Sequence, residues 1–224
     1  SFQSAEGLSN VTFLPGSVVM KNNPIMEMLI GFEHMTEVGK DLSGKSLEIA
    51  HNAMLQTMNG MRSCNKMEGA LVLMWNPMLE TLEGLQNLTT IDGKNSIGDS
   101  ILLMSNPKLK DLHGLSGLSG SVPGAVSLEK MDSLQSVQGL AGITSVERPN
   151  IYGNALELIS LPKLESAQGI GLQGVVPGAV VVEKTGLKNV DGLQGITGSE
   201  GKNLLDVSVL IHDNKALTNL DGLC

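Results

Sequence analysis

The chain has 224 residues, enough for one sizeable hydrophobic core, and repeat proteins of this length are commonly one elongated domain. Its 27 glycines, 12 methionines and few aromatic residues favour thin, regular packing layers over a bulky globular core. A net charge of −8 without a run of lysine or arginine argues against nucleic-acid binding, and no apolar stretch approaches the roughly 20 residues of a membrane-spanning helix.

Residues 1–17 carry no copy of the repeat that fills the rest of the chain, so we expect them to form an N-terminal cap or arm. They contain the first of two N-glycosylation sequons, at Asn10, and the second lies at Asn87. About two sequons are expected by chance in this composition. They are therefore compatible with secretion and do not demonstrate it.

Residues 18–224 repeat one pattern eight times, with two apolar residues in alternation, then Asn, then leucines at every third position before Gly-Leu. The clearest copies are SLEIAHNAMLQTMNGM, ALVLMWNPMLETLEGL, SILLMSNPKLKDLHGL and SVLIHDNKALTNLDGL. Alternating apolar residues such as Leu71 and Leu73 have the period of a short strand. The pattern predicts an all-β fold, a parallel β-helix or β-solenoid of about eight coils, with the last coil incomplete at Cys224.

An asparagine follows the strand in five copies, where the chain has to bend. Asparagine suits a bend because its side chain can satisfy backbone groups and because it tolerates the left-handed conformation. We predict that this column forms a stacked ladder that satisfies buried backbone at the corner. Its members are Asn23, Asn52, Asn76, Asn106 and Asn214.

The leucines at every third position, such as Leu79, Leu82 and Leu85, are expected to point inward. A spacing of three could also suit a helix, but the recurring glycine costs about 1 kcal/mol inside one, so extended or tightly turned segments fit better. The methionines in these columns are then core residues and do not form a cofactor site. They are Met26, Met54, Met58 and Met61.

The glycines that end the repeats reveal a longer period of two coils. They are Gly31, Gly60, Gly84, Gly114, Gly139, Gly169, Gly192 and Gly222, at successive spacings of 29, 24, 30, 25, 30, 23 and 30 residues. The phrase PGAVSLEK also returns one period later as PGAVVVEK. The coils therefore form four long-short pairs, as tandem duplication of a coil pair would produce.

The phrases NPKLKDLHGL and NPMLETLEGL, each after a short apolar strand, resemble the coils of receptor L domains and of related fungal cell-wall glycoproteins. The resemblance extends from about Val18 to Leu223. It implies a right-handed β-helix-like solenoid used for ligand recognition at the cell surface, without catalysis. The leucine-rich repeat is the second choice, because Ile101, Leu103 and Asn106 match its core pattern while the alternating spacing does not.

Catalytic residues are not apparent in the sequence. The only arginines, Arg62 and Arg148, lie on different coils, and the four histidines occupy four different register positions without a metal-ligand spacing. We therefore expect no enzyme activity, metal or cofactor. Polysaccharide lyase and ice-binding functions, both known for β-solenoids, remain minor alternatives.

The two cysteines, Cys64 and Cys224, should lie far apart along the solenoid and not bond to each other. A free, buried thiol is the expectation for Cys64. Cys224 ends the chain in mid-coil and could pair with a group outside this sequence.

One surface feature departs from the regular pattern. If Leu71 and Ile101 point inward, then Val72, Met74, Leu102 and Met104 point outward on adjacent coils, beside the single tryptophan, Trp75. An outward apolar patch should be covered, either by a segment of this chain, with residues 1–17 as the candidate, or by a partner.

We therefore predict a non-catalytic recognition or adhesion module that binds a protein or glycan partner through this sheet face, at the cell surface or outside the cell. The alternative is a structural accessory subunit that braces a larger assembly, with another subunit docked on the open C-terminal coil.

Overall fold

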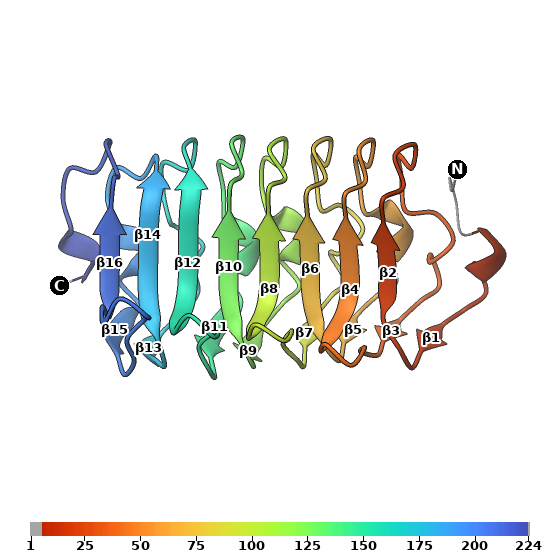
Figure 1. The fold of residues 1–224 in the computed structure, drawn as a ribbon, viewed down its shortest axis with the longest axis horizontal. Coiled ribbons are helices and arrows are strands. Elements are labelled where there is room, and N and C mark those ends of the chain that lie inside the picture. The colour runs from red at the N-terminus through yellow and green to blue at the C-terminus, as the bar shows by residue number, and fades with distance from the viewer. Residues whose placement is uncertain (1–5, 224) are drawn as a thin grey trace.

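The computed structural model describes residues 6–223, which form a parallel β-solenoid of about eight coils stacked along one axis (Figure 1). This confirms the all-β repeat architecture expected from the sequence. Helical structure is confined to six short 3-10 turns. They are η1 (Glu6–Leu8), η2 (Asn59–Met61), η3 (His113–Leu115), η4 (Gln138–Leu140), η5 (Asp191–Leu193) and η6 (Asp221–Leu223).

One eight-stranded sheet forms the long wall of the solenoid, with one strand from each coil in chain order. Its strands are β2 (Val18–Lys21), β4 (Lys45–Ala50), β6 (Ala70–Met74), β8 (Asp99–Met104), β10 (Ala125–Glu129), β12 (Asn154–Leu161), β14 (Ala179–Thr185) and β16 (Val209–His212). All neighbours are parallel, and Leu47, Leu71 and Ile101 share one register position. Like residues therefore stack on like residues.

Shorter parallel ladders form the opposite side of each coil. One sheet joins β1 (Phe13–Leu14), β3 (Glu37–Val38), β5 (Lys66–Met67) and β7 (Thr90–Ile91). Two further pairs join β9 (Gly120–Val122) with β11 (Ile143–Val146), and β13 (Gly174–Val176) with β15 (Ile196–Ser199).

The core is a continuous column of inward aliphatic side chains, and the third-position leucines Leu79, Leu82 and Leu85 are fully buried in it. Met26, Met58 and Met61 are buried there too, as predicted. The prediction for Met54 is wrong: this side chain is exposed and its neighbour, Leu55, takes the core position. Leu55 follows Asn52 by three residues, as Leu79 follows Asn76, so the coil keeps the alignment of the repeat.

The repeat glycines allow neighbouring coils to touch backbone to backbone. A Cβ atom added to Gly60 would lie 1.5 Å from the carbonyl oxygen of Leu29, and one added to Gly139 would lie 1.7 Å from that of Leu112. Both glycines lie in 3-10 turns with ordinary negative φ. Lack of a side chain, and not backbone freedom, is therefore what these positions require.

Four of the five asparagines form a continuous ladder. The Oδ1 of Asn76 accepts from the backbone amide of Asn52 (3.1 Å), and its Nδ2 donates to the carbonyl of Ile49 (3.0 Å). Equivalent bonds link Asn23 to Asn52 and Asn76 to Asn106. Met131 and Leu161 interrupt the column, so Asn214 lies apart from the other four and accepts from the amide of Thr185 at 2.9 Å.

Each long coil also carries an outer loop just before its main strand. In all four, an Asp or Asn side chain accepts from the amides two and four residues later; these residues are Asp41, Asn95, Asn150 and Asn203. Loops two coils apart touch directly, because the amide of Ile151 donates to the carbonyl of Ile97 at 2.8 Å. The extra residues of the long coils therefore build a layer outside the sheet.

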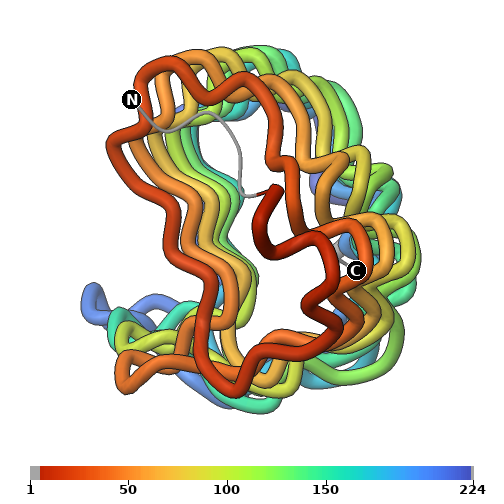
Figure 2. The backbone as a smooth tube through the Cα atoms, turned by 90° about the vertical axis from the view of Figure 1, so that its right-hand side faces the viewer, coloured from red at the N-terminus to blue at the C-terminus, as the bar shows by residue number. Residues whose placement is uncertain are grey.

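Residues 6–17 cross the N-terminal opening of the solenoid, as the view along the axis shows (Figure 2). Val11 and Leu14 pack against the main core, and Leu14 pairs with Val38 through the β1–β3 ladder. The described part of the N-terminal segment thus covers the end of the solenoid and not its sheet face.

Candidate functional site

Every coil leaves the main sheet through one residue in the left-handed conformation. These residues, here called the αL row, are Asn22, His51, Trp75, Ser105, Lys130, Ser160, Lys184 and Asp213, with φ between 53° and 58°. This conformation costs roughly 1–2 kcal/mol for a residue other than glycine. The expectation that the bend lies at the ladder asparagines is wrong by one residue, because the bend lies directly before them.

Trp75 is the most unusual member of the αL row, because a bulky side chain rarely adopts positive φ. Its amide donates to the carbonyl of Met104 (3.0 Å), so the backbone continues the sheet ladder. The indole stacks on the ring of His51, with centroids 4.6 Å apart and planes 16° apart, and stays 42 % exposed. The strained backbone thus presents an aromatic platform to solvent.

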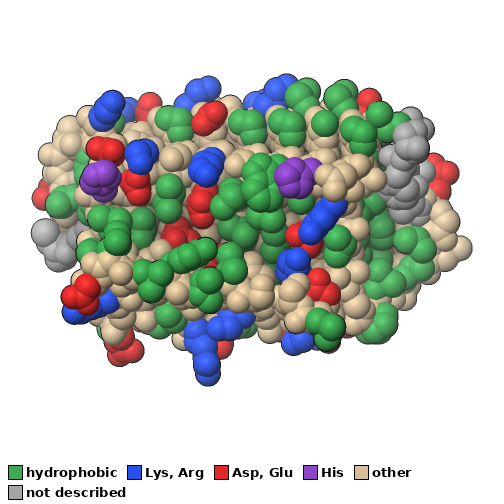
Figure 3. Space-filling view, in the orientation of Figure 1, with side chains coloured by type: hydrophobic (Ala, Val, Ile, Leu, Met, Phe, Trp, Pro, Cys, Tyr) green, Lys and Arg blue, Asp and Glu red, His purple; other side chains and the backbone are tan. Residues whose placement is uncertain are grey.

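A shallow groove of about 450 Å³ begins at this platform. It is lined by Trp75, Pro77, Ser105, Pro107, Lys130 and Asp132, which come from three successive coils. The tryptophan and prolines give the groove an apolar floor, and the hydroxyl, ammonium and carboxylate groups provide polar partners of both signs. Figure 3 shows hydrophobic side chains gathered over the middle of this face of the molecule, with charged groups around them.

The outward apolar patch exists, but it is not an open surface. Val72 and Leu102 point out of the sheet and are only 1 % and 5 % exposed, because Ile97 of an outer loop packs over them. A segment of this chain therefore covers these two side chains, as one of the expected alternatives had it, but the segment is the outer loop with Ile97, and the described residues 6–17 pack on the main core instead. Met74 and Met104 are half-buried beside them, which leaves Trp75 as the accessible member of the predicted face.

The same outward column contains buried carboxylates on either side of this patch. Glu48 on β4 pairs with Lys21 (2.6 Å) and with Lys45. Burial alone would raise the pKa of Glu48, but the two lysine hydrogen bonds lower it, so it stays ionised. Glu157 on β12 lies at the equivalent place and has no lysine partner among residues 6–223. Sequence reasoning did not single out these groups.

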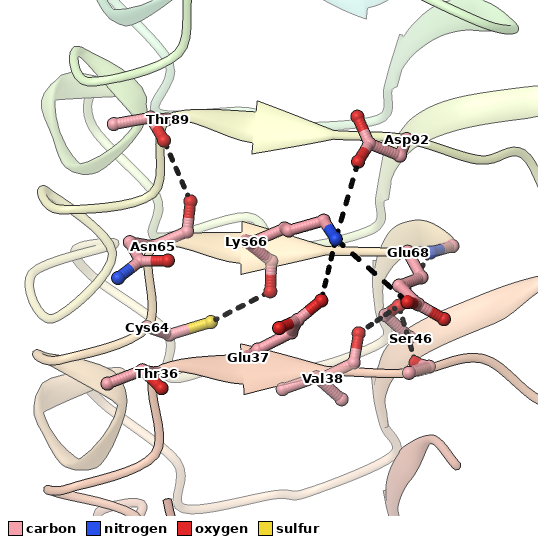
Figure 4. A network of polar contacts seen from close by, with 12 residues as sticks. Thr36, Glu37, Val38, Ser46, Cys64, Asn65, Lys66, Glu68, Thr89 and Asp92 are labelled. Carbon is pink, nitrogen blue, oxygen red and sulfur yellow. Dashed lines mark hydrogen bonds and ion pairs between the residues drawn. The ribbon is translucent and has the colours of Figure 1, made fainter. Parts of the chain in front are cut away.

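An ion-pair network lies on the sheet of β1, β3, β5 and β7, on the opposite side of the solenoid (Figure 4). Lys66 on β5 lies 2.6 Å from Glu37 on β3 and 3.9 Å from both Glu68 and Asp92. Because these groups are substantially exposed, solvent screens each pair and its contribution to stability is small. The network braces three coils and offers no site for chemistry.

Cys64 lies next to this network as a buried free thiol, as predicted. Its Sγ faces the carbonyl of Lys66 at 3.7 Å. Burial raises the pKa of Cys64 to about 11, so the reactive thiolate is scarce at neutral pH. The other cysteine, Cys224, lies outside the described residues.

Asn10 and Asn87, the sequon asparagines, are both exposed. The Nδ2 of Asn87 donates to the carbonyl of Arg62 at 2.7 Å. Within residues 6–223 no group of three or more His, Cys, Asp or Glu side chains could hold a metal ion. The same part of the chain has no helix long and apolar enough to cross a bilayer.

Comparisons with protein-family models, with curated proteins and with solved structures gave no match for this chain.

Proposed function

We propose that this chain is a non-catalytic recognition module, extracellular or at the cell surface, that binds a glycan in the groove beside Trp75. The observation that carries the proposal is the platform itself: the only tryptophan of the chain is held exposed in a costly conformation. The coil geometry requires this conformation along the whole αL row, so the choice of a tryptophan there, where asparagine would cost less, is what points to function. The resemblance of the coils to receptor L domains agrees with a recognition role.

A sugar suits this groove for two reasons. The C–H face of a sugar ring is apolar and can pack on the negative π-face of the indole. Its hydroxyl groups need donors and acceptors of the kind that Ser105, Lys130 and Asp132 supply at the rim.

The test uses Trp75 as its own probe, because no other tryptophan contributes to the fluorescence. Oligosaccharides selected on a glycan array are titrated into the protein and the tryptophan emission is followed. Because Trp75→Asn removes this fluorophore, binding of the variant and of the wild type is compared by isothermal titration calorimetry, and we expect the variant to bind at least tenfold more weakly, about 1.4 kcal/mol. Tyr152→Ala, which removes another exposed ring on an outer loop, should leave binding unchanged.

The stability of Trp75→Asn separates binding from folding. Asn22 occupies the same place in the first coil, and asparagine tolerates the left-handed conformation. The variant should therefore be as stable as the wild type or more stable. A marked loss of stability would mean that Trp75 serves the fold, and failure of every glycan to bind would refute the proposal.

A structural subunit remains the second candidate, because the C-terminal coil offers a different surface. Strand β16 pairs only with β14 among the described residues, and the nearby side chains of Leu204 and Leu205 are largely exposed. An unpaired edge beside exposed leucines is a typical docking surface. Sedimentation at micromolar concentration decides this: association lost in Leu204→Ser/Leu205→Ser favours the subunit, and a stable monomer argues against self-docking.

A further inference from the structure

Two acidic side chains, Asp99 and Glu157, are buried together on the outside of the main sheet. Asp99 begins β8 and is 1 % exposed, and Glu157 on β12 is 5 % exposed. Ser127, on the intervening strand β10, lies between them and is fully buried. Asn150 of the outer loop closes the cluster from above: its Nδ2 donates to Asp99 (3.1 Å) and to Glu157 (3.0 Å).

The hydrogen atoms of this cluster can be counted. The Oγ of Ser127 lies 3.0 Å from Oδ1 of Asp99 and 2.5 Å from Oε2 of Glu157. A hydroxyl carries one hydrogen and can donate to only one of them. The other contact is a hydrogen bond only if the carboxyl group itself carries a proton and donates to Ser127.

No positive side chain compensates this pair. The other charged groups on the strands and loops packed around it are Glu129 on β10 with Lys130 directly after it, Glu183 and Lys184 on β14, and Lys94, Arg148 and Lys202 on or beside the outer loops. Within residues 6–223 none of them forms an ion pair with Asp99 or Glu157. Glu48, in contrast, has two lysines at the equivalent place, so two ionised carboxylates here would be costly.

We propose that Asp99 and Glu157 share one proton and that this proton locks the outer loop at 150–154 onto the sheet. Asp99 donates it to Ser127, and the Ser127 hydroxyl donates to the ionised Glu157. Glu157 then accepts from Ser127, from Asn150 and from Nδ2 of Asn154 (2.5 Å). This arrangement gives each contact one hydrogen.

The direction of the pKa shift of Asp99 agrees with a proton held in this cluster. Burial raises the pKa of Asp99 to about 7, and the charges of Glu157 and Glu129 act the same way, although hydrogen bonds from Asn150 and Ser127 oppose them. An unfolded Asp titrates near 3.9. A pKa raised by folding means that the stabilisation is complete below about pH 4 and is lost as pH rises through about 7.

Loss of the proton should first weaken the attachment of the outer loop at 150–154 to the sheet. Without it, Ser127 can serve only one of two charged carboxylates, and Asn154 Oδ1 is already buried without a partner. The loop at 150–154 is bonded to Ile97, and Ile97 covers the apolar patch of Val72 and Leu102. Loss of the proton on Asp99 therefore controls how firmly this patch stays covered.

The experiment follows amide hydrogen exchange of Ile151 and the melting temperature between pH 5.5 and 8.5. We expect the protection of Ile151, corrected for the intrinsic rate, to fall by up to tenfold per pH unit as pH rises towards about 7, because opening then releases one proton, and to level off above that pH. Asp99→Asn mimics the protonated side chain and should remove this slope and melt higher than the wild type at pH 8.

Glu48→Gln is the matched control, because it alters a buried carboxylate at the same place of the sheet. It should lower stability throughout this pH range and keep the wild-type slope. A wild type without a slope, or an unchanged slope in Asp99→Asn, would overturn the proposal. So would restoration of Ile151 protection at pH 8 by calcium or magnesium, since a cation would then compensate the pair.

Discussion

The asparagine ladder should carry a large share of the stability of the middle coils, and Asn76→Ala is the sharpest test. The substitution leaves the buried amide of Asn52 and the buried carbonyl of Ile49 without their partners. Each unsatisfied buried group costs about 1–3 kcal/mol, so the expected loss is about 2–6 kcal/mol. That is a large fraction of the about 5–15 kcal/mol that stabilises a typical domain.

The measurement is urea denaturation followed by far-ultraviolet circular dichroism, with Asn214→Ala as the control. Asn214 makes the same kind of bonds, to the amide of Thr185 and the carbonyl of Val182, but it is only partly buried. Water can replace it there, so a loss of about 1 kcal/mol is expected. Equal losses in the two variants, or less than 1 kcal/mol for Asn76→Ala, would refute the reasoning.

Two further predictions follow from the packing. Gly60→Ala should destabilise the protein by about 3 kcal/mol or more in the same assay, because the new Cβ meets the Leu29 carbonyl, whereas Gly16→Ala, with open space around it, should be nearly neutral. Cys64 should resist a thiol reagent at pH 8 in the native protein and react once urea unfolds it; rapid labelling of the folded state would contradict its burial.

The fold could be predicted from the sequence because every coil repeats the same packing problem. Alternation in strands such as β6 gave the inward and outward faces, and the spacing of the glycines gave the long-short pairs. The ladder bonds between Asn52, Asn76 and Asn106 follow from the same register. Once coils stack in parallel, equal positions in the repeat become neighbours in space.

The sequence does not reveal that an outer loop covers Val72 and Leu102, and the reason is physical. The glycine spacing shows that the long coils contain extra residues, but it does not show where these residues lie. Asp41, Asn95, Asn150 and Asn203 recur as the first residue of an outer loop. That recurrence, with a turn residue at each start, was the available signal. Burial of Val72 and Leu102 depends on how these loops fold back, which no local pattern specifies.

The left-handed position of Trp75 could not be read from residue type. Glycine and asparagine are the usual signals for this conformation, and the αL row holds His, Trp, Ser, Lys and Asp as well. The pairing of Asp99 with Glu157 was equally hidden, because it joins strands separated by a third one. Contacts of this kind depend on the stack as a whole and not on any one coil.

The outer loops also determine by how many residues a solenoid of this kind can be lengthened or shortened. Their first residues are spaced 54, 55 and 53 residues apart, and neighbouring loops meet across a loop-free coil. Deletion of one coil would bring two loops onto adjacent strands, about 4.8 Å apart, where both cannot fit, or leave two bare coils side by side. Deletion or insertion of a whole pair keeps every loop contact, so variants of this solenoid should differ in length by multiples of about 54 residues.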